Sequence, residues 1–277
     1  MGREAALALV NNAALLISLT VIYSALYIRF KKEKLLLQKI ISGLLLGVIA
    51  MAVMVDSWEL SPGVVFDTRS VVLGLTGLYF GFIPSIITVI MTSILRILMG
   101  GSGAAVGVSV IICSATTGLL WRYRRRRALH QMTLFELYLF GIVVHIFMMI
   151  GMLFLPADSR NAFFSVAAVP VMLVYPIATA LTGWAMSSKE AQLRGEEAVH
   201  ELSLARKRLA AIVEASPVPI ISLDMEYNVT EWNQAAEKVF GWKRSEVIGR
   251  PLPIVPEEDV QNHRDLTEKT RSGDYQR

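Results

Sequence analysis

The chain has 277 residues, of which 54% are apolar and 18% charged, and its mean hydropathy is +0.50. This composition excludes a soluble protein with an ordinary polar surface, because globular domains carry about 25% charged residues. The formal net charge is +4, yet the basic residues gather beside apolar runs, at 29–34 and 122–127. That placement is typical of membrane proteins. The composition therefore predicts the lipid bilayer as a partner and excludes nucleic acid.

Five apolar runs are long enough to cross a membrane, since a spanning helix needs about 20 residues. They are 5–28, 35–55, 104–121, 135–155 and 163–186. Residues 187–277 are rich in charge and contain no such run. The sequence predicts an all-α polytopic membrane bundle followed by a smaller soluble domain.

The apolar stretch 64–100 is interrupted at Gly81 and Pro84, which predicts the turn of a helical hairpin. Arg69 and Arg96 are equally far from that turn along the chain. About 13 residues separate each arginine from the turn, or about 20 Å of helix. A hairpin would therefore bring both arginines to one depth inside the hydrocarbon layer.

Charged side chains at such depth are costly unless they face a partner or water, so they indicate a functional site. Asp67 can neutralise one arginine, and the glycines of 100–103 precede the next span, whose first N–H groups attract anions. Forked guanidinium groups suit a small carboxylate. Two interpretations stay open: a site for a carboxylate or other anion, and an ion-pair network of Asp67, Arg69 and Arg96 that fixes the hairpin.

Lys and Arg near span ends remain on the cytoplasmic side. Residues 29–39 and 122–127 are therefore expected inside, with the N-terminus outside and the soluble domain cytoplasmic. The chain has five spans plus the hairpin if the hairpin re-enters, and seven spans if both of its arms cross. Charge bias leaves both possibilities open.

Residues 187–215 favour a helix, with one apolar stripe formed by Leu202, Ala205, Leu209 and Ile212. The stripe predicts a helix that pairs in a homodimer and relays motion from the membrane. A solvated connector is the alternative.

The membrane half resembles the LytS–YhcK type five-transmembrane receptor region of bacterial and archaeal signalling proteins. The matching pattern is Asp67-x-Arg69, then Phe80-Gly81-x-x-Pro84, then Arg96-x-x-x-Gly100-Gly101. The resemblance implies a cytoplasmic-membrane receptor whose ligand contacts Arg69 and Arg96. The further candidates for ligand contact are Asp67, Ser102, Gly107 and Ser109.

The same resemblance implies a homodimer, downstream signalling partners, and an output domain such as a histidine kinase or diguanylate cyclase. The family is also distantly similar to the substrate-binding subunits of vitamin transporters. A transport component is therefore one rival function, and a plain membrane anchor for a soluble sensor is another.

The soluble part resembles a PAS domain, an α/β fold. Residues 208–217 match its first helix, 218–224 and 229–232 its first two strands, and 233–240 the helix that follows. Three further strands should come after Gly273, so the PAS domain is expected to be truncated and the sequence to be a fragment of a longer protein. The expected domains are a transmembrane sensor (1–186), a helical linker (187–208) and the start of a PAS domain (209–277).

No cofactor is predicted. His263 resembles the haem-ligating position of oxygen-sensing PAS domains, but most histidines at that place bind no haem. His145 lies on an apolar span and is expected to bond to a neighbouring helix and not to a metal. The chain has no P-loop, zinc-protease motif, nucleophile elbow, kinase or cyclase signature, so any enzymatic output is expected from residues beyond it.

Overall fold

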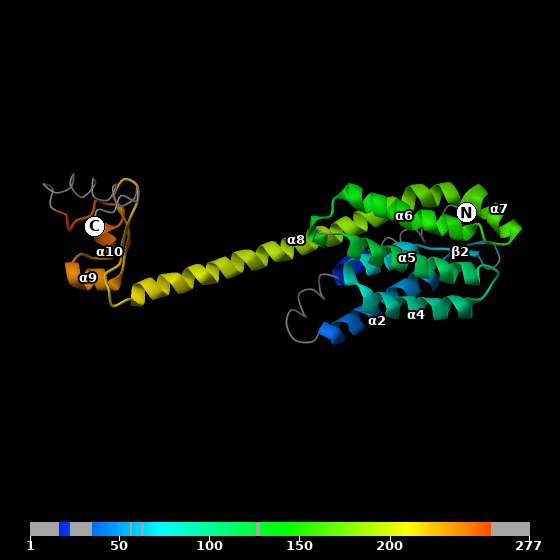
Figure 1. Ribbon diagram of the computed structural model, residues 1–277, viewed down its shortest axis with the longest axis horizontal. Helices are drawn as coiled ribbons and strands as arrows, with labels where there is room; N and C mark the ends of the chain where they lie inside the picture. Colours follow the sequence, from blue (N-terminus) through cyan, green and yellow to red (C-terminus); the bar gives the residue numbers. More distant parts are fainter. Residues whose placement is uncertain (1–16, 23–34, 56, 62–63, 126–127, 256–277) are drawn as a thin grey trace. The chain divides into compact units, whose positions relative to one another are not determined.

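The computed structural model describes residues 17–22, 35–55, 57–61, 64–125 and 128–255 (Figure 1). The chain divides into two compact units, with the boundary between Gly195 and Glu196. The first unit is a bundle of helices, and the second contains strands and short helices.

Five helices are long and apolar enough to cross a membrane within the described part of the chain. They are α2 (Leu35–Val55), α4 (Phe82–Met99), α5 (Ala104–Arg124), α6 (Leu134–Met152) and α8 (Ala168–Ala215). The expected span 5–28 lies mostly outside the described residues. Its described part, 17–22, is helical. The predicted multi-pass helical bundle is confirmed.

The predicted turn between two helices is confirmed at Gly81, whose φ is 82°. Glycine adopts this left-handed conformation without the steric cost of a Cβ atom. Pro84 lies in the first turn of α4, where its missing N–H costs no hydrogen bond.

The first arm of the hairpin is shorter than expected. The chain forms an antiparallel strand pair, β1 (Trp58–Ser61) and β2 (Val64–Phe66), before a helix begins at Arg69. That helix has seven α-helical residues, α3 (Arg69–Leu75), and five π-helical residues, η1 (Thr76–Phe80). At about 1.5 Å per residue it is about 18 Å long, less than the thickness of the hydrocarbon layer.

This short helix is the most enclosed part of the bundle, because every residue of α3 is buried. It packs against α5, whereas the second arm, α4, packs mainly against α2. Glycines allow the close approach: a Cβ atom built on Gly118 of α5 would overlap the carbonyl oxygen of Gly74. Small residues with this role are common between membrane helices.

The C-terminal half of the bundle differs from the expected run 163–186. A separate helix, α7 (Ala157–Val166), precedes α8, which begins only at Ala168. The membrane span and the linker expected at 187–208 are one continuous helix of 48 residues. The short 3-10 helix η2 (Leu129–Gln131) joins α5 to α6.

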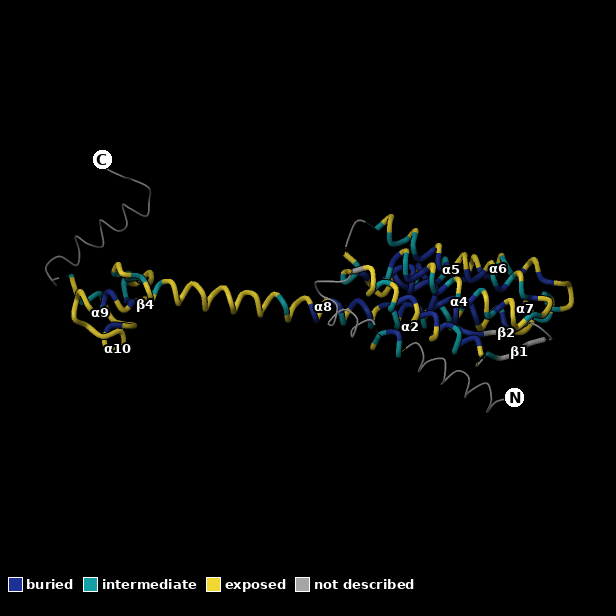
Figure 2. Tube along the Cα trace, turned by 90° about the horizontal axis from the view of Figure 1, so that it is seen from below, coloured by how far each residue is buried: buried dark blue, intermediate teal, exposed yellow. Residues whose placement is uncertain are grey.

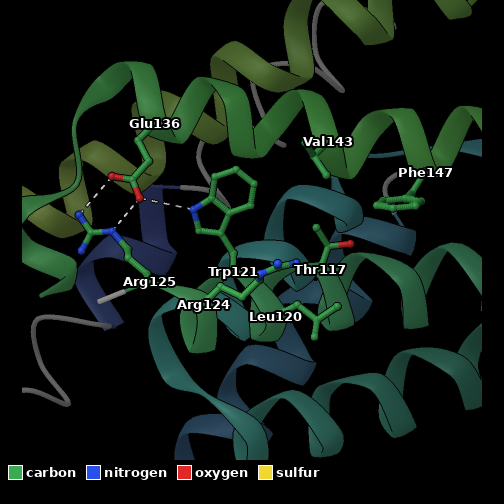
Figure 3. A pocket seen from close by; sticks show the side chains of 8 residues that line it. All are labelled: Thr117, Leu120, Trp121, Arg124, Arg125, Glu136, Val143 and Phe147. Carbon is green, nitrogen blue, oxygen red and sulfur yellow. Dashed lines mark hydrogen bonds and ion pairs between the residues drawn. The ribbon is translucent and has the colours of Figure 1, made fainter. Parts of the chain in front are cut away.

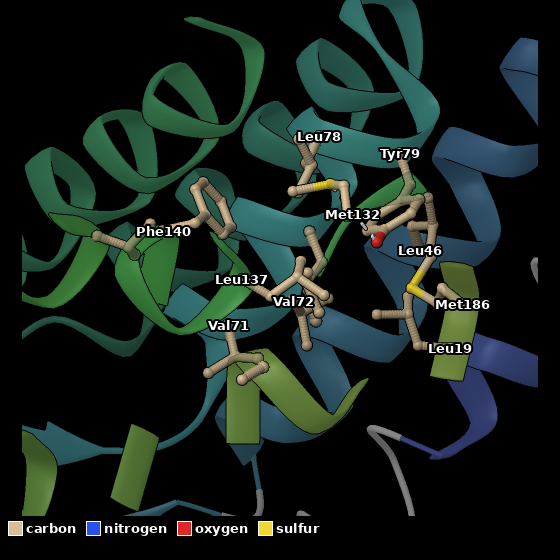
Figure 4. Close-up of a cluster of buried hydrophobic side chains, with 14 of the residues drawn as sticks. Leu19, Leu46, Val71, Val72, Leu78, Tyr79, Met132, Leu137, Phe140 and Met186 are labelled. Atoms are coloured by element: carbon tan, nitrogen blue, oxygen red, sulfur yellow. Dashed lines mark hydrogen bonds between the residues drawn. The ribbon is translucent and has the colours of Figure 1, made fainter. Parts of the chain in front are cut away.

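The core of the bundle is built around α3 and η1. Figure 4 shows Tyr79 beside Met132, Leu46 and Met186, which come from four different segments of the chain. Each of these side chains is at least 95% buried.

The second unit has the elements expected of the start of a PAS domain. β3 (Ile221–Leu223) pairs antiparallel with β4 (Val229–Trp232), followed by α9 (Gln234–Phe240) and α10 (Arg244–Val247). The second strand has the predicted bounds, and Asn233 caps α9 by accepting the N–H of Ala236. A small core surrounds the fully buried Trp232. The predicted histidine position, His263, lies outside the described residues.

Candidate functional site

Three charged residues are buried at one end of the bundle. Asp67 and Arg69 are each 6% exposed, and Arg96 is 2% exposed. Asp67 and Arg69 lie where β2 leads into α3, and Arg96 lies in the last turn of α4. The hairpin thus brings both arginines to the same end of the bundle, as the sequence predicts.

Asp67 fixes the start of α3. Its Oδ1 accepts the backbone N–H of Arg69 at 2.9 Å and lies 3.2 Å from Nε of the same residue. The second carboxylate oxygen, Oδ2, and Arg69 Nη1 have no hydrogen-bond partner among the described residues. Both groups are buried, so Oδ2 can still accept a hydrogen bond and Nη1 can still donate one to a further group.

Arg96 is held by the turn that follows it. Its Nη1 donates to the carbonyl oxygen of Gly100 at 2.9 Å. The side chain crosses Gly107 of α5, where a built Cβ atom would lie 2.5 Å from Arg96 Nε. Asp67 and Arg69 lie within electrostatic range of Arg96. The three charges therefore form one cluster with a formal sum of +1.

Sequence reasoning missed the polar neighbours of this cluster. Half-buried Tyr175 of α8 lies within electrostatic range of Asp67 and Arg69. The ring of Tyr175 meets that of His145, with centroids 5.4 Å apart. His145 Nε2 and Ser70 Oγ are 3.1 Å apart. The expected bond from His145 to a neighbouring helix is thus confirmed, and this contact joins α6 to α3.

The other candidate residues are placed differently. Gly107 is buried against Arg96, as described above, whereas Ser102 is exposed in the turn before α5. Ser109 is exposed, and its hydroxyl donates within its own helix to the carbonyl oxygens of Ala105 and Val106. The structure brings Gly107 to Arg96 and leaves the two serines exposed.

The opposite end of the buried helix is bonded to α8. The Tyr79 hydroxyl donates to the carbonyl oxygen of Gly183 at 2.8 Å and lies 2.6 Å from Ser187 Oγ. Arg122 donates to the carbonyl oxygens of Leu78 and Tyr79 at 2.8 and 2.9 Å. These two carbonyl oxygens are available as acceptors because the π-helical segment disrupts the i to i−4 hydrogen-bond pattern of an α-helix.

The membrane unit and the second unit each match a known family. A model of the family described as 5TMR of 5TMR-LYT matches residues 9–189. That is well over half of the chain. The chain belongs to the 5TMR-LYT family. The resemblance to a LytS-type receptor region is therefore confirmed for the membrane unit.

A second model, described as PAS fold, matches residues 207–274. Neither a curated protein nor a solved structure matches significantly. A 5TMR-LYT region followed by a PAS fold is the arrangement of a multi-pass membrane sensor in signalling. Both matched regions are sensor-type domains and neither is catalytic.

Proposed function

We propose that the chain is the input part of a signalling receptor, and that the cluster of Asp67, Arg69 and Arg96 binds a small carboxylate or another small anion. The ligand would bind at the extracytoplasmic end of the bundle and alter the position of α8. The PAS domain and an output domain, such as a histidine kinase or diguanylate cyclase, would receive the change.

One observation carries the proposal: two arginines and one aspartate are at least 94% buried in one cluster. A buried positive charge is costly unless a counter-charge and hydrogen bonds accompany it. Arg69 Nη1 has no hydrogen-bond partner among the described residues, and a carboxylate would supply both the charge and the acceptor.

The buried helix provides a physical route from this cluster to α8. Arg69 begins α3, and Tyr79, ten positions later, is bonded to Gly183 and Ser187 of α8. Tyr175, which belongs to α8 itself, lies within electrostatic range of Asp67 and Arg69. A ligand that binds more tightly to one position of α3 would bias the position of α8, because only a difference in affinity between states shifts their populations.

The cytoplasmic part of α8 supports dimerisation. Leu202, Leu209 and Ile212 are between 64% and 70% exposed, and Figure 2 shows this part of α8 as mostly exposed. Their heptad spacing would bury them against the same helix of a second copy. Disulfide cross-linking of a Leu209→Cys, Cys113→Ser variant in membranes tests this, with exposed Arg206→Cys as the control. Equal cross-linking at both positions would contradict specific pairing.

The proposed orientation places the N-terminus outside and the PAS domain in the cytoplasm. Arg122, Arg124 and Arg125 lie at the end of α5 opposite Gly107. Because basic residues are retained inside, the end with Arg96 would face outward in the cytoplasmic membrane. Accessibility labelling of Ser102→Cys in a Cys113→Ser background tests this from each side of sealed vesicles, and labelling from the cytoplasmic side alone would contradict it.

The ligand proposal is tested by thermal unfolding of the detergent-purified protein with acetate, succinate, citrate, phosphate and chloride. A ligand at 100 times its Kd stabilises the folded state by about 2.7 kcal/mol. Arg69→Gln and Arg96→Gln should each lose this stabilisation while remaining folded by circular dichroism. Arg206→Gln, an equal charge change on the exposed part of α8, should keep it.

The variant Asp67→Asn distinguishes an anion-binding site from a purely structural ion-pair network. In a binding site the cluster becomes more positive, so the variant should bind the same anion more tightly. In a structural network the variant is only destabilised, and no anion restores its stability. The second result, together with no stabilisation of the parent protein by any anion, would contradict the proposal.

Transport is the rival function, and net uptake of the ligand into liposomes would support it over the receptor. An anchor function would need no buried charge cluster. Exchange of Arg69, Arg96 and Asp67 for apolar residues should then leave signalling through the PAS domain unchanged.

A further inference from the structure

The outer surface of α5 and α6 contains a cavity that is separate from the arginine cluster. It has a volume of about 510 Å³ and is open on one side, and Figure 3 shows the side chains that line it. The lining residues are Thr117, Leu120, Trp121, Arg124, Arg125, Glu136, Val143 and Phe147. Both helices are long and apolar enough to span the membrane, so we expect this cavity to face lipid.

The cavity changes character along its length. One part of its wall is formed by the apolar residues Leu120, Val143 and Phe147, of which Leu120 is 58% and Phe147 47% exposed. Toward the end of α5 the wall carries Trp121, Arg124 and Arg125. A phospholipid has a matching arrangement, with apolar acyl chains toward the bilayer centre and a phosphate at the interface. Tryptophan is also enriched at the interface.

One of the two lining arginines is already neutralised. Arg125 Nε lies 2.6 Å from Glu136 Oε1, and Arg125 Nη2 donates to Glu136 Oε2 at 3.1 Å. Trp121 Nε1 also donates to this carboxylate, at 3.4 Å. The negative charge of Glu136 is therefore held at one edge of the cavity by Arg125 and Trp121 (Figure 3).

Arg124 remains as the cation of the cavity. Its side chain is exposed, and it forms no ion pair with any residue that the structure describes. Side chains on a helix tilt toward its N-terminus, so Arg124 extends back along α5 over the cavity, beside Trp121 (Figure 3). A guanidinium can form two parallel hydrogen bonds to the oxygens of a phosphate.

We propose that this cavity binds one anionic phospholipid, such as a phosphatidylglycerol. Its phosphate is held by Arg124, and one acyl chain lies over Leu120, Val143 and Phe147. Basic pockets between membrane helices at the cytoplasmic side are a known form of anionic lipid recognition. The inference does not depend on the anion site at Arg69 and Arg96, which lies at the opposite end of the bundle.

Native mass spectrometry of the delipidated protein with added phosphatidylglycerol or phosphatidylcholine tests the proposal. Phosphatidylglycerol should bind with about tenfold higher affinity, which is the difference expected from one charge-assisted hydrogen-bond pair. Arg124→Gln should reduce its binding to the level of phosphatidylcholine. The control Arg206→Gln, with the same charge change outside the bundle, should leave the preference unchanged.

A second variant tests the apolar part of the cavity without changing any charge. Val143→Trp fills the space and should reduce the binding of both lipids. Ile90→Trp, at a residue of α4 that is 53% exposed, should leave the binding of both lipids unchanged. Soluble glycerol phosphate should not displace the lipid, because it lacks the acyl chains.

Three results would overturn the proposal. The first is an undiminished preference for phosphatidylglycerol in Arg124→Gln. The second is displacement of the lipid by glycerol phosphate, which would indicate an anion site alone. The third is a change of oligomeric state in Val143→Trp with unchanged lipid binding, which would indicate that a second copy covers the cavity.

Discussion

Gly107 of α5 lies directly against the side chain of Arg96, and the space between them admits the hydrogen of a glycine but not the Cβ atom of any other residue. A Cβ atom built on Gly107 would be 2.5 Å from Arg96 Nε and 3.0 Å from Cδ. The long arginine side chain is buried, so it cannot move aside into solvent. The position of one guanidinium of the candidate site is therefore set by a glycine on another helix.

Gly107→Ala should displace Arg96 and destabilise the protein by about 1–3 kcal/mol, the usual cost of overpacking a core. It should also weaken anion binding, because Arg96 would lose its position relative to Arg69. Thermal unfolding with and without anion measures both effects. Gly195→Ala is the matched control, since nothing lies within 4 Å of its built Cβ atom. An equal effect in both variants would show that helix propensity, and not the contact with Arg96, is responsible.

The bond between Tyr79 and Ser187 couples the buried helix to α8. Tyr79→Phe removes the hydroxyl that lies 2.6 Å from Ser187 Oγ and donates to Gly183. We expect a loss of about 0.5–1.5 kcal/mol in stability. A double-mutant cycle with Ser187→Ala should give a coupling energy of at least about 0.5 kcal/mol, because the two hydroxyls share one interaction.

Strict additivity of these two substitutions would contradict the coupling. Ser187 also donates to the carbonyl oxygen of Leu129 at 3.1 Å, so Ser187→Ala alone should cost more than the coupling energy. For the proposed relay, Tyr79→Phe should retain anion binding but reduce the ligand-induced change in hydrogen exchange of residues 187–215.

The spans expected at 35–55, 104–121 and 135–155 and the turn of the hairpin were predictable, because apolar length and the pair Gly81 and Pro84 are local signals. The central place of α3 was not predictable. An apolar helix that faces lipid and one that is enclosed by protein have the same composition, because both surroundings are apolar. The glycines at 74, 77 and 118, which permit close helix contact, are the signal that could have identified it.

Part of the site was predictable. Arg69 and Arg96 are equally far from the turn along the chain, and this spacing places both arginines at the same end of the bundle. The position of a residue along a helix does not tell which face of the helix it occupies. Ser109 is therefore exposed on α5, although Gly107, two residues earlier, is buried. Tyr175, His145 and Ser70 come from three helices, and no local pattern links them. Their meeting is a consequence of tertiary packing.

Asp224 should show a depressed pKa in the PAS unit. Its carboxylate accepts the backbone N–H groups of Asn228 and Glu226 at 2.8 and 3.0 Å and the side-chain amide of Asn228 at 3.2 Å. The bond from the Asn228 backbone is the main cause of a pKa below the unfolded value of 3.8. A lowered folded-state pKa means that the turn is stabilised above pH 3.8 and loses this stabilisation as pH falls through the folded-state pKa.

An NMR titration of the Asp224 carboxyl carbon measures the pKa directly. Its midpoint should lie below 3.8. Asn228→Ala should remove only a small part of the shift, since the backbone N–H groups remain. A midpoint at or above 3.8 in the parent protein would contradict the hydrogen-bonded turn.

Asn233 joins the end of α8 to the PAS unit through one buried side-chain amide. Its Nδ2 donates to the carbonyl oxygens of Val213 and Val218 at 2.9 and 3.0 Å. Its Oδ1 accepts the N–H groups of Ile220 and Ala236 at 2.9 and 3.0 Å. The residue is fully buried, so four backbone groups depend on this amide.

Asn233→Ala should destabilise the PAS unit by at least about 2 kcal/mol, since it removes a helix cap worth about 1 kcal/mol and leaves further buried groups unpaired. Hydrogen exchange of Ile220 and Ala236 should accelerate first, because their N–H groups lose an acceptor. Gln234→Ala, at the neighbouring exposed position, should leave this exchange unchanged. Asn233→Asp keeps the acceptor but not the donor, so it should protect Ile220 while releasing the end of α8 at Val213. If both substitutions accelerated exchange equally at every position, the amide would act only through general stability, and α8 would be joined to the PAS unit by other contacts.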